Sequence, residues 1–316
     1  MAQIESGIVE GFYGKPWSRA ARLRFLDFMH TAGFRTYIYA PKDDPYHREK
    51  WQEAYPAADA GHLVRLVSRC SDLGIDFCWA LSPGLSVRYS SRRDLEVLVD
   101  KFRRIGDMGV RTFALFLDDI PPDLMHPQDR KNWDSLGTAH ADFVNKVFEA
   151  LATGGDARLW FCPTEYIGVS PTPYLNAVGE GVHPDVGIFW TGPLVVSPRI
   201  TAAETRTISG ILRRKPLLWD NFPVNDYNPN KLNLGPLRAR DTQLPELIGG
   251  YFANPMNQSA ASCPPLLTVA DYLRDPGNYD PEKSWQKALR APWGERIPAD
   301  AARTLNDYSE LWQPGF

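Results

Sequence analysis

The chain has 316 residues, which allows either two ordinary domains or one large α/β barrel with an appendage. Its 35 Lys and Arg against 38 Asp and Glu give a formal net charge of −3, and no segment is strongly basic, so nucleic-acid binding is excluded. Apolar residues make up 43% of the chain, but no apolar stretch approaches the ~20 residues of a membrane helix. We therefore expect a folded protein outside the membrane.

The four cysteines, Cys70, Cys78, Cys162 and Cys263, have no CxxC spacing. Such isolated thiols are typical of a reducing compartment rather than of a disulfide framework or a zinc site. The first residues also lack the cationic start and apolar segment of a secretory signal. We predict a cytoplasmic protein.

Short runs rich in β-branched and aromatic residues predict eight strands. They are Ile8–Val9, Thr36–Tyr39, Ile75–Trp79, Thr112–Leu117, Leu159–Cys162, Val186–Trp190, Pro216–Trp219 and Ile248–Phe252. Between them, apolar residues three and four apart predict helices, among them Ala20–Ala32, Ala57–Leu73, Arg92–Met108 and Asp134–Leu151. Eight alternating units favour an α/β fold of the closed (β/α)8 TIM-barrel type over an open sheet.

The pattern changes after the eighth unit. The stretch Asp275–Pro281 contains helix-breaking residues, and helical patterns resume over Glu282–Leu289 and Ala299–Trp312. We expect a (β/α)8 barrel over residues 1–273 and a short helical extension over residues 274–316.

Polar side chains follow most of the predicted strands. They include Glu10, Lys42, Asp43, Asp44, Asp118, Asp119, Glu165, Tyr166, Asp220, Asn221 and Asn254. In a (β/α)8 barrel these strand ends form one face, and that face holds the active site. Ordinary polar turns would explain part of this pattern, but not its many carboxylates.

Asp118 and Asp119 directly follow the most apolar predicted strand. Consecutive strand residues point to opposite faces, so two adjacent carboxylates converge on a substrate only where the backbone leaves strand geometry. Repulsion between them is expected to raise the pKa of one carboxyl, which suits an acid/base pair. The alternative is a helix N-terminus that one of the aspartates caps.

Lys42 could donate hydrogen bonds to substrate hydroxyls. Its neighbours Asp43, Asp44 and His47 could equally form a polar loop network, and their spacing fits no standard set of metal ligands. We therefore expect no metal site.

A further group combines Trp219, Asp220 and Asn221 with Asn225, Asp226 and Tyr227 just beyond. An aromatic wall beside amide and carboxylate groups is what a sugar site needs. The alternative is a core tryptophan followed by a polar turn. The aromatic content of 12%, with ten tryptophans, agrees with either interpretation.

Eight motifs occur in chain order: GIVEGFYGKPW (7–17), YIYAPKDD (37–44), ALSPG (80–84), FALFLDDI (113–120), FCPTEY (161–166), WTGP (190–193), LWDN (218–221) and ANP (253–255). Together they resemble the catalytic domain of glycoside hydrolase family 84. This is the family of β-N-acetylglucosaminidases that includes the protein O-GlcNAcases.

The resemblance implies retaining, exo-acting hydrolysis of terminal β-linked N-acetylglucosamine, without a cofactor. In such substrate-assisted catalysis the 2-acetamido oxygen of the sugar attacks the anomeric carbon and forms an oxazoline intermediate. The first acid of the family motif falls on Asp118, which would accept the acetamido N–H. The second falls on Asp119, which would protonate the leaving oxygen and then deprotonate the attacking water.

By the same resemblance, the remaining site residues fall on eight positions. The acetamido pocket falls on Tyr166, Trp219 and Asn221 with Tyr227 beside it, and the residues that hold sugar hydroxyls fall on Gly11, Lys42, Asp226 and Asn254. Two alternatives stay open: a chitinase- or hyaluronidase-like endoglycosidase with the same acid pair, and a non-catalytic module that binds N-acetylglucosamine. The sequence does not fix the aglycone or the oligomeric state.

Overall fold

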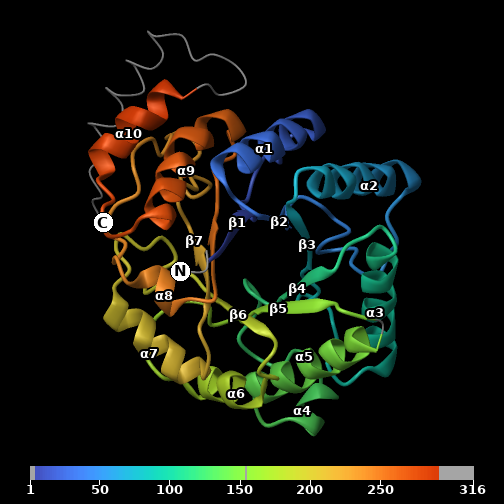
Figure 1. Cartoon of the computed structure of the whole chain (residues 1–316). Coiled ribbons are helices and arrows are strands. Elements are labelled where there is room, and N and C mark those ends of the chain that lie inside the picture. The colour runs from blue at the N-terminus through green and yellow to red at the C-terminus, as the bar shows by residue number, and fades with distance from the viewer. Residues whose placement is uncertain (1–3, 154, 292–316) are drawn as a thin grey trace.

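The computed structural model describes residues 4–153 and 155–291. Eight parallel strands close into a barrel in chain order, with β8 paired to β1 (Figure 1). The strands are Glu5–Glu10 (β1), Thr36–Tyr39 (β2), Asp76–Leu81 (β3), Thr112–Phe116 (β4), Arg158–Cys162 (β5), Gly187–Trp190 (β6), Leu217–Asp220 (β7) and Gly250–Ala253 (β8). The predicted (β/α)8 TIM barrel is confirmed, and each predicted strand overlaps an observed one.

Helices follow the strands and surround the barrel (Figure 1). Within the described residues they are Arg19–Ala32 (α1), Ala57–Asp72 (α2), Arg92–Gly106 (α3), Asp129–Asn132 (α4), Leu136–Ala152 (α5), Pro173–Gly181 (α6), Ala202–Leu212 (α7), Leu244–Leu247 (α8), Ser259–Arg274 (α9) and Pro281–Arg290 (α10). Helix α1 shows how the sequence sets such bounds. The Ser18 hydroxyl accepts from the N–H of Ala21 at its start, and Gly33 ends it with a φ of 92°.

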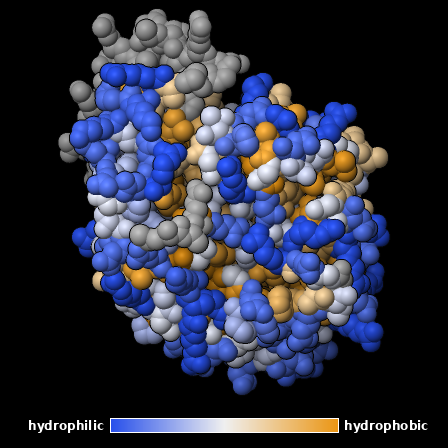
Figure 2. Space-filling view, viewed as in Figure 1, coloured by the Kyte–Doolittle hydropathy of each residue, from blue (hydrophilic) through white to orange (hydrophobic). Residues whose placement is uncertain are grey.

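Alternate strand residues point into two hydrophobic cores. Val9, Ile38 and Phe116 belong to the cluster inside the barrel, whereas Ile8 and Tyr37 pack beneath the helices. The outer surface of the helices is largely hydrophilic (Figure 2). Because side chains fill the barrel, the loops at the strand ends are the place where a ligand can bind.

Helix α10 packs on the barrel through Trp285, which is 2% exposed and clusters with Leu234, Met256 and Ala288. This helix confirms the helical pattern predicted over residues 282–289. The helix predicted over residues 299–312 lies outside the described residues. The division of the chain after residue 273 stays a prediction.

None of the helices in the described part of the chain is long and apolar enough to cross a membrane.

Candidate active site

A cavity of about 220 Å³ opens at the carboxyl ends of the strands. All ten predicted site residues line it: Gly11, Lys42, Asp118, Asp119, Tyr166, Trp219, Asn221, Asp226, Tyr227 and Asn254. They come from β7 and from the loops that follow β1, β2, β4, β5, β7 and β8. The closed barrel thus brings residues that are far apart in the sequence into one cavity.

The two adjacent aspartates both face this cavity because the backbone leaves strand geometry between them. Strand β4 ends at Phe116, and Asp119 adopts a left-handed conformation with a φ of 49°. Only 8% of the Asp118 side chain is exposed, whereas 31% of the Asp119 side chain is exposed. The alternative that one of them caps a helix is wrong, since α4 begins only at Asp129.

Lys42 lies between the two carboxylates. Its Nζ donates to Asp118 Oδ2 at 2.7 Å and lies 3.7 Å from Asp119 Oδ2. Burial alone would lower the pKa of Lys42, but the charges of Asp118 and Asp119 outweigh burial and raise this pKa above its ordinary value. The side chain is therefore a buried ammonium group that holds Asp118 in place.

The other oxygen of Asp118, Oδ1, is buried and has no hydrogen-bond partner among the described residues. A buried carboxylate oxygen without a donor is energetically costly. The cavity thus presents an acceptor that a ligand with an N–H or O–H group can satisfy.

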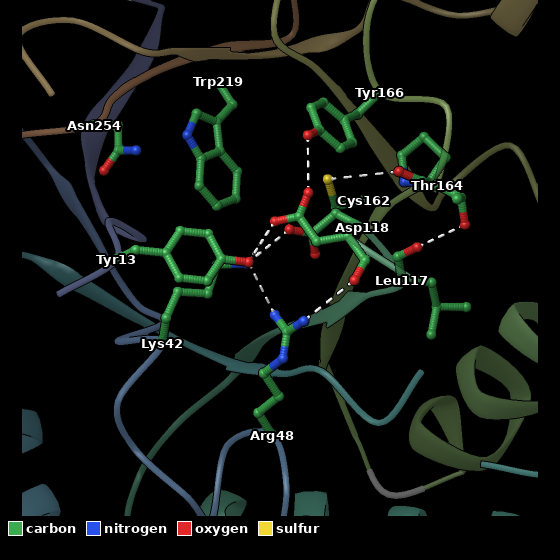
Figure 3. Close-up of polar contacts among 12 residues, drawn as sticks. Tyr13, Lys42, Arg48, Leu117, Asp118, Cys162, Thr164, Tyr166, Trp219 and Asn254 are labelled. Carbon is green, nitrogen blue, oxygen red and sulfur yellow. Dashed lines mark hydrogen bonds and ion pairs between the residues drawn. The ribbon is translucent and has the colours of Figure 1, made fainter. Parts of the chain in front are cut away.

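Asp119 is surrounded by donors instead. The Tyr13 hydroxyl donates to its Oδ2 at 2.7 Å, and the Tyr166 hydroxyl donates to its Oδ1 at 2.9 Å (Figure 3). Burial would raise the pKa of Asp119, but the charge of Lys42 and these two hydrogen bonds outweigh burial and hold the pKa below its ordinary value. The expectation that repulsion raises a pKa in this pair is therefore wrong for Asp119, because nearby cationic and hydroxyl groups compensate its charge.

Trp219 forms a flat wall of the cavity. A side-chain carbon at Gly11 would approach the Trp219 ring to 2.4 Å, so only glycine allows this packing. The indole Nε1 donates to Asn221 Oδ1 at 3.0 Å, and Asn254 Nδ2 donates to the same oxygen at 2.9 Å. Asn254 Oδ1 is buried, has no hydrogen-bond partner within residues 4–153 and 155–291, and is a second free acceptor. Trp219 also belongs to the barrel core, so the core interpretation is confirmed for a residue that lines the cavity as well.

Asp226 and Tyr227 lie at the rim. Asp226 Oδ2 accepts from the backbone N–H of Tyr13 at 2.8 Å, which ties the β7 and β1 loops together. Tyr227 is 59% exposed, and its hydroxyl accepts from Asn233 Nδ2 at 3.0 Å. The exposed ring of Tyr227 can contact a ligand that extends out of the cavity.

Several predicted strand-end carboxylates serve the structure instead. Glu10 is buried against Arg22 of α1 at 2.7 Å, and Asp220 is buried against Arg240 at 2.8 Å. Both turn away from the cavity because the residue before each points into the barrel. Asp44 accepts from the Tyr46 N–H and the Tyr55 hydroxyl of its own loop, so the loop-network interpretation is confirmed for this residue.

Sequence reasoning missed several residues that line the cavity, among them Tyr13, Cys162, Val195 and Val196. Tyr13 lies within the motif GIVEGFYGKPW and follows a strand, and these two features could have indicated that it lines the cavity. The two valines are exposed apolar residues of the β6–α7 loop, and nothing in their residue type points to a site. In the described part of the chain, no group of three or more His, Cys, Asp or Glu could hold a metal ion.

A family model described as beta-N-acetylglucosaminidase matches residues 6–307 of the chain. The chain belongs to the β-N-acetylglucosaminidase family. This confirms the resemblance to glycoside hydrolase family 84. The protein O-GlcNAcases of Rattus norvegicus and Mus musculus are relatives within it, each 36% identical over 274 residues.

Solved structures of this β-N-acetylglucosaminidase family share the barrel. A mutant of the Thermobaculum terrenum O-GlcNAc hydrolase is 40% identical, with a TM-score of 0.88 over 90% of this chain and 62% of its own. CpGH84B is 35% identical, with a TM-score of 0.82 over 90% of this chain and 50% of its own. The matches to the rat and mouse proteins cover 85% of this chain but only 30% of theirs. The comparisons thus show the family and the fold. The matched residues include the whole candidate active site.

Proposed function

We propose that the chain is a retaining exo-β-N-acetylglucosaminidase that uses the 2-acetamido oxygen of its substrate as the nucleophile. The observation that carries this proposal is the buried free oxygen of Asp118. It lies in a small cavity with an aromatic wall, and the other oxygen of the same carboxylate is held by the Lys42 ammonium group. An acetamido N–H is a donor that satisfies such an acceptor.

In this proposal Asp118 accepts the acetamido N–H and turns the acetamido oxygen toward the anomeric carbon. As that oxygen attacks, positive charge develops on the forming oxazoline ring, and the carboxylate stabilises it. Trp219 and Asn221 enclose the acetamido group, and Tyr166 donates to its oxygen. The position of all four residues around one cavity supports this assignment.

Asp119 protonates the leaving oxygen and then removes a proton from the attacking water. Its more exposed position suits a group that must reach the glycosidic bond and then water. The hydrogen bonds that lower its pKa oppose protonation. When Tyr166 donates to the acetamido oxygen instead, Asp119 loses one of these bonds, and its proton affinity rises at the moment an acid is required.

The remaining predicted residues hold the sugar hydroxyls. These are Gly11 through its backbone, Lys42, Asp226 and Asn254, while Tyr227 contacts the region beside the acetamido pocket. The unpartnered Asn254 Oδ1 supports this role, because a sugar hydroxyl can donate to it.

The first test is hydrolysis of an aryl β-N-acetylglucosaminide without added metal, together with inhibition by a thiazoline that mimics the oxazoline. We expect turnover, release of N-acetylglucosamine alone from oligosaccharides, and much tighter binding of the thiazoline than of the free sugar. Binding of N-acetylglucosamine without turnover would instead identify a binding module. Oligosaccharide products would identify an endoglycosidase.

We further propose that the protein acts in the cytoplasm and that its substrates include O-GlcNAc peptides. The four cysteines are all buried free thiols, which suits a reducing compartment. The relatives named O-GlcNAcase support the substrate class. Measuring kcat/KM for O-GlcNAc peptides beside small β-N-acetylglucosaminides tests it, and peptides that release no N-acetylglucosamine while the small glycosides are hydrolysed would contradict it.

A further inference from the structure

The guanidinium group of Arg48, on the loop between β2 and α2, contacts Asp119 in two ways. Nη2 donates to the backbone carbonyl oxygen of Asp119 at 3.2 Å. Nη1 donates to the Tyr13 hydroxyl at 3.3 Å, and this hydroxyl donates to Asp119 Oδ2 at 2.7 Å (Figure 3). Arg48 therefore holds the main chain of Asp119 directly and its side chain through Tyr13.

We infer that Arg48 and Tyr13 act as positioning residues that hold the Asp119 carboxyl in place for proton transfer. This inference rests on the proposed function, in which Asp119 is the acid and base.

The backbone of Asp119 requires such support. Its φ of 49° lies in the left-handed region, which aspartate enters more readily than most residues but still at a cost in free energy that its surroundings must offset. The carbonyl that accepts from Arg48 belongs to the peptide unit following Asp119. A donor on this oxygen fixes the orientation of that unit, and with it the direction in which the Asp119 side chain leaves the backbone.

Both positioning residues are themselves held firmly. The Tyr13 N–H donates to Asp226 Oδ2 at 2.8 Å, the Tyr13 carbonyl accepts from Asn257 Nδ2 at 2.8 Å, and the Tyr13 ring centroid lies 5.3 Å from Lys42 Nζ. Tyr13 can therefore keep its hydroxyl in one position.

Arg48 lies in a loop segment fixed on both sides. The buried Lys101 of α3 donates through Nζ to the carbonyl oxygens of Tyr46 at 2.6 Å and Trp51 at 2.8 Å. The ring Nδ1 of His47 lies 2.7 Å from the carbonyl oxygen of Ala80. The guanidinium group thus extends from a rigid base toward Asp119.

The positioning residues also affect the proton affinity of Asp119. The Tyr13 hydrogen bond and the Arg48 charge both lower the pKa of Asp119. Replacing either residue so that the hydrogen bond or the charge is lost should raise the pKa of Asp119. It should also leave the Asp119 carboxyl less well oriented toward the leaving oxygen. A residue that only stabilised the fold would produce neither effect selectively.

The test compares wild type with Arg48→Gln, Arg48→Lys and Tyr13→Phe on aryl and alkyl β-N-acetylglucosaminides. For each protein, kcat/KM is measured as a function of pH and of the pKa of the leaving group. For Arg48→Gln we expect about a tenfold larger loss on the poor leaving groups than on the activated ones, a part of the factor that acid catalysis typically supplies. The alkaline limb of the profile should move to higher pH in Arg48→Gln and Tyr13→Phe. In Arg48→Lys, which keeps the charge, the limb should stay near its wild-type position.

Arg92→Gln is the matched control, because Arg92 is an exposed arginine of α3 whose ion pair with Glu96 lies on the surface. Thiazoline binding to each variant checks that its cavity is intact. Equal losses on both substrate classes with an unmoved alkaline limb, in Arg48→Gln and Tyr13→Phe alike, would overturn the inference while leaving the proposed function standing. An inactive wild type would instead overturn the proposed function itself.

Discussion

At the residue scale, two adjacent aspartates acquire different properties from their neighbours. Asp118 is buried against an ammonium group and keeps one free oxygen, whereas Asp119 is partly exposed and accepts from two tyrosine hydroxyls. The sequence allowed the position of the pair to be predicted, since both follow an apolar strand. It did not allow the direction of the pKa change at Asp119 to be predicted, because that depends on Lys42 and on tyrosines from other loops.

Asp119→Ala should slow hydrolysis of poor leaving groups by about 10²–10⁴-fold, the range typical of acid catalysis, and affect activated aryl leaving groups far less. The physical reason is that an activated leaving group departs without a proton. Steady-state kcat/KM across leaving groups checks this, with Asp72→Ala at the exposed end of α2 as the control. A uniform loss would remove the acid role from Asp119.

Asp118→Asn should behave differently, since Asp118 assists the attacking acetamido group rather than the leaving group. We expect a loss of about 10²-fold or more, similar for good and poor leaving groups, because the charge that stabilises the oxazoline is removed. The same leaving-group series measures it. A loss confined to poor leaving groups would mean that the two aspartates have been assigned the wrong way round.

At the element scale, the period of two along each strand decides which polar residues reach the cavity. Trp219 points inward and Asp220 outward, where Asp220 accepts from Nε and Nη2 of Arg240 and from the Tyr251 hydroxyl. The eight strands could be predicted from their composition, but the inward or outward direction of each strand-end residue could not. That direction depends on where each strand ends relative to its neighbours, which is why Glu10 and Asp220 were included in the predicted face.

Arg240→Met should destabilise the protein by about 3–5 kcal/mol, because it leaves the buried Asp220 carboxylate without its cationic partner. Chemical denaturation measures this change in the free energy of unfolding. Arg104→Met, which breaks an exposed pair with Asp100, is the control and should cost at most about 1 kcal/mol. Equal effects of the two substitutions would contradict the interpretation that Arg240 neutralises the buried Asp220 carboxylate.

At the scale of the whole molecule, the barrel follows from eight strand–helix units that the sequence shows in order, and α10 adds a helix packed through Trp285. Two histidines are buried within this architecture. Burial lowers the pKa of His47 to about 4 and that of His140 to about 3. Both remain neutral in the folded protein at a pH where the unfolded chain has already taken up protons.

This difference predicts that the free energy of unfolding falls as the pH drops below about 6.5, the ordinary pKa of histidine. For His140 alone the loss by pH 4.5 is about 2–3 kcal/mol, since each pKa unit corresponds to about 1.4 kcal/mol. Urea denaturation between pH 7.5 and 4.5 should show a shallower decline in His140→Gln than in wild type. The exposed His183→Gln should follow wild type, and an unchanged slope in His140→Gln would contradict the prediction.

In the proposed mechanism the acetamido oxygen of the substrate is the nucleophile. The most direct test of this mechanism is the rate of hydrolysis of aryl glycosides whose N-acetyl group carries zero, one, two or three fluorine atoms, which make that oxygen progressively less nucleophilic. We predict that kcat falls steeply along this series while the aryl leaving group is kept constant. A kcat that is independent of fluorination would contradict substrate assistance and show that a group of the enzyme, or water, attacks the anomeric carbon.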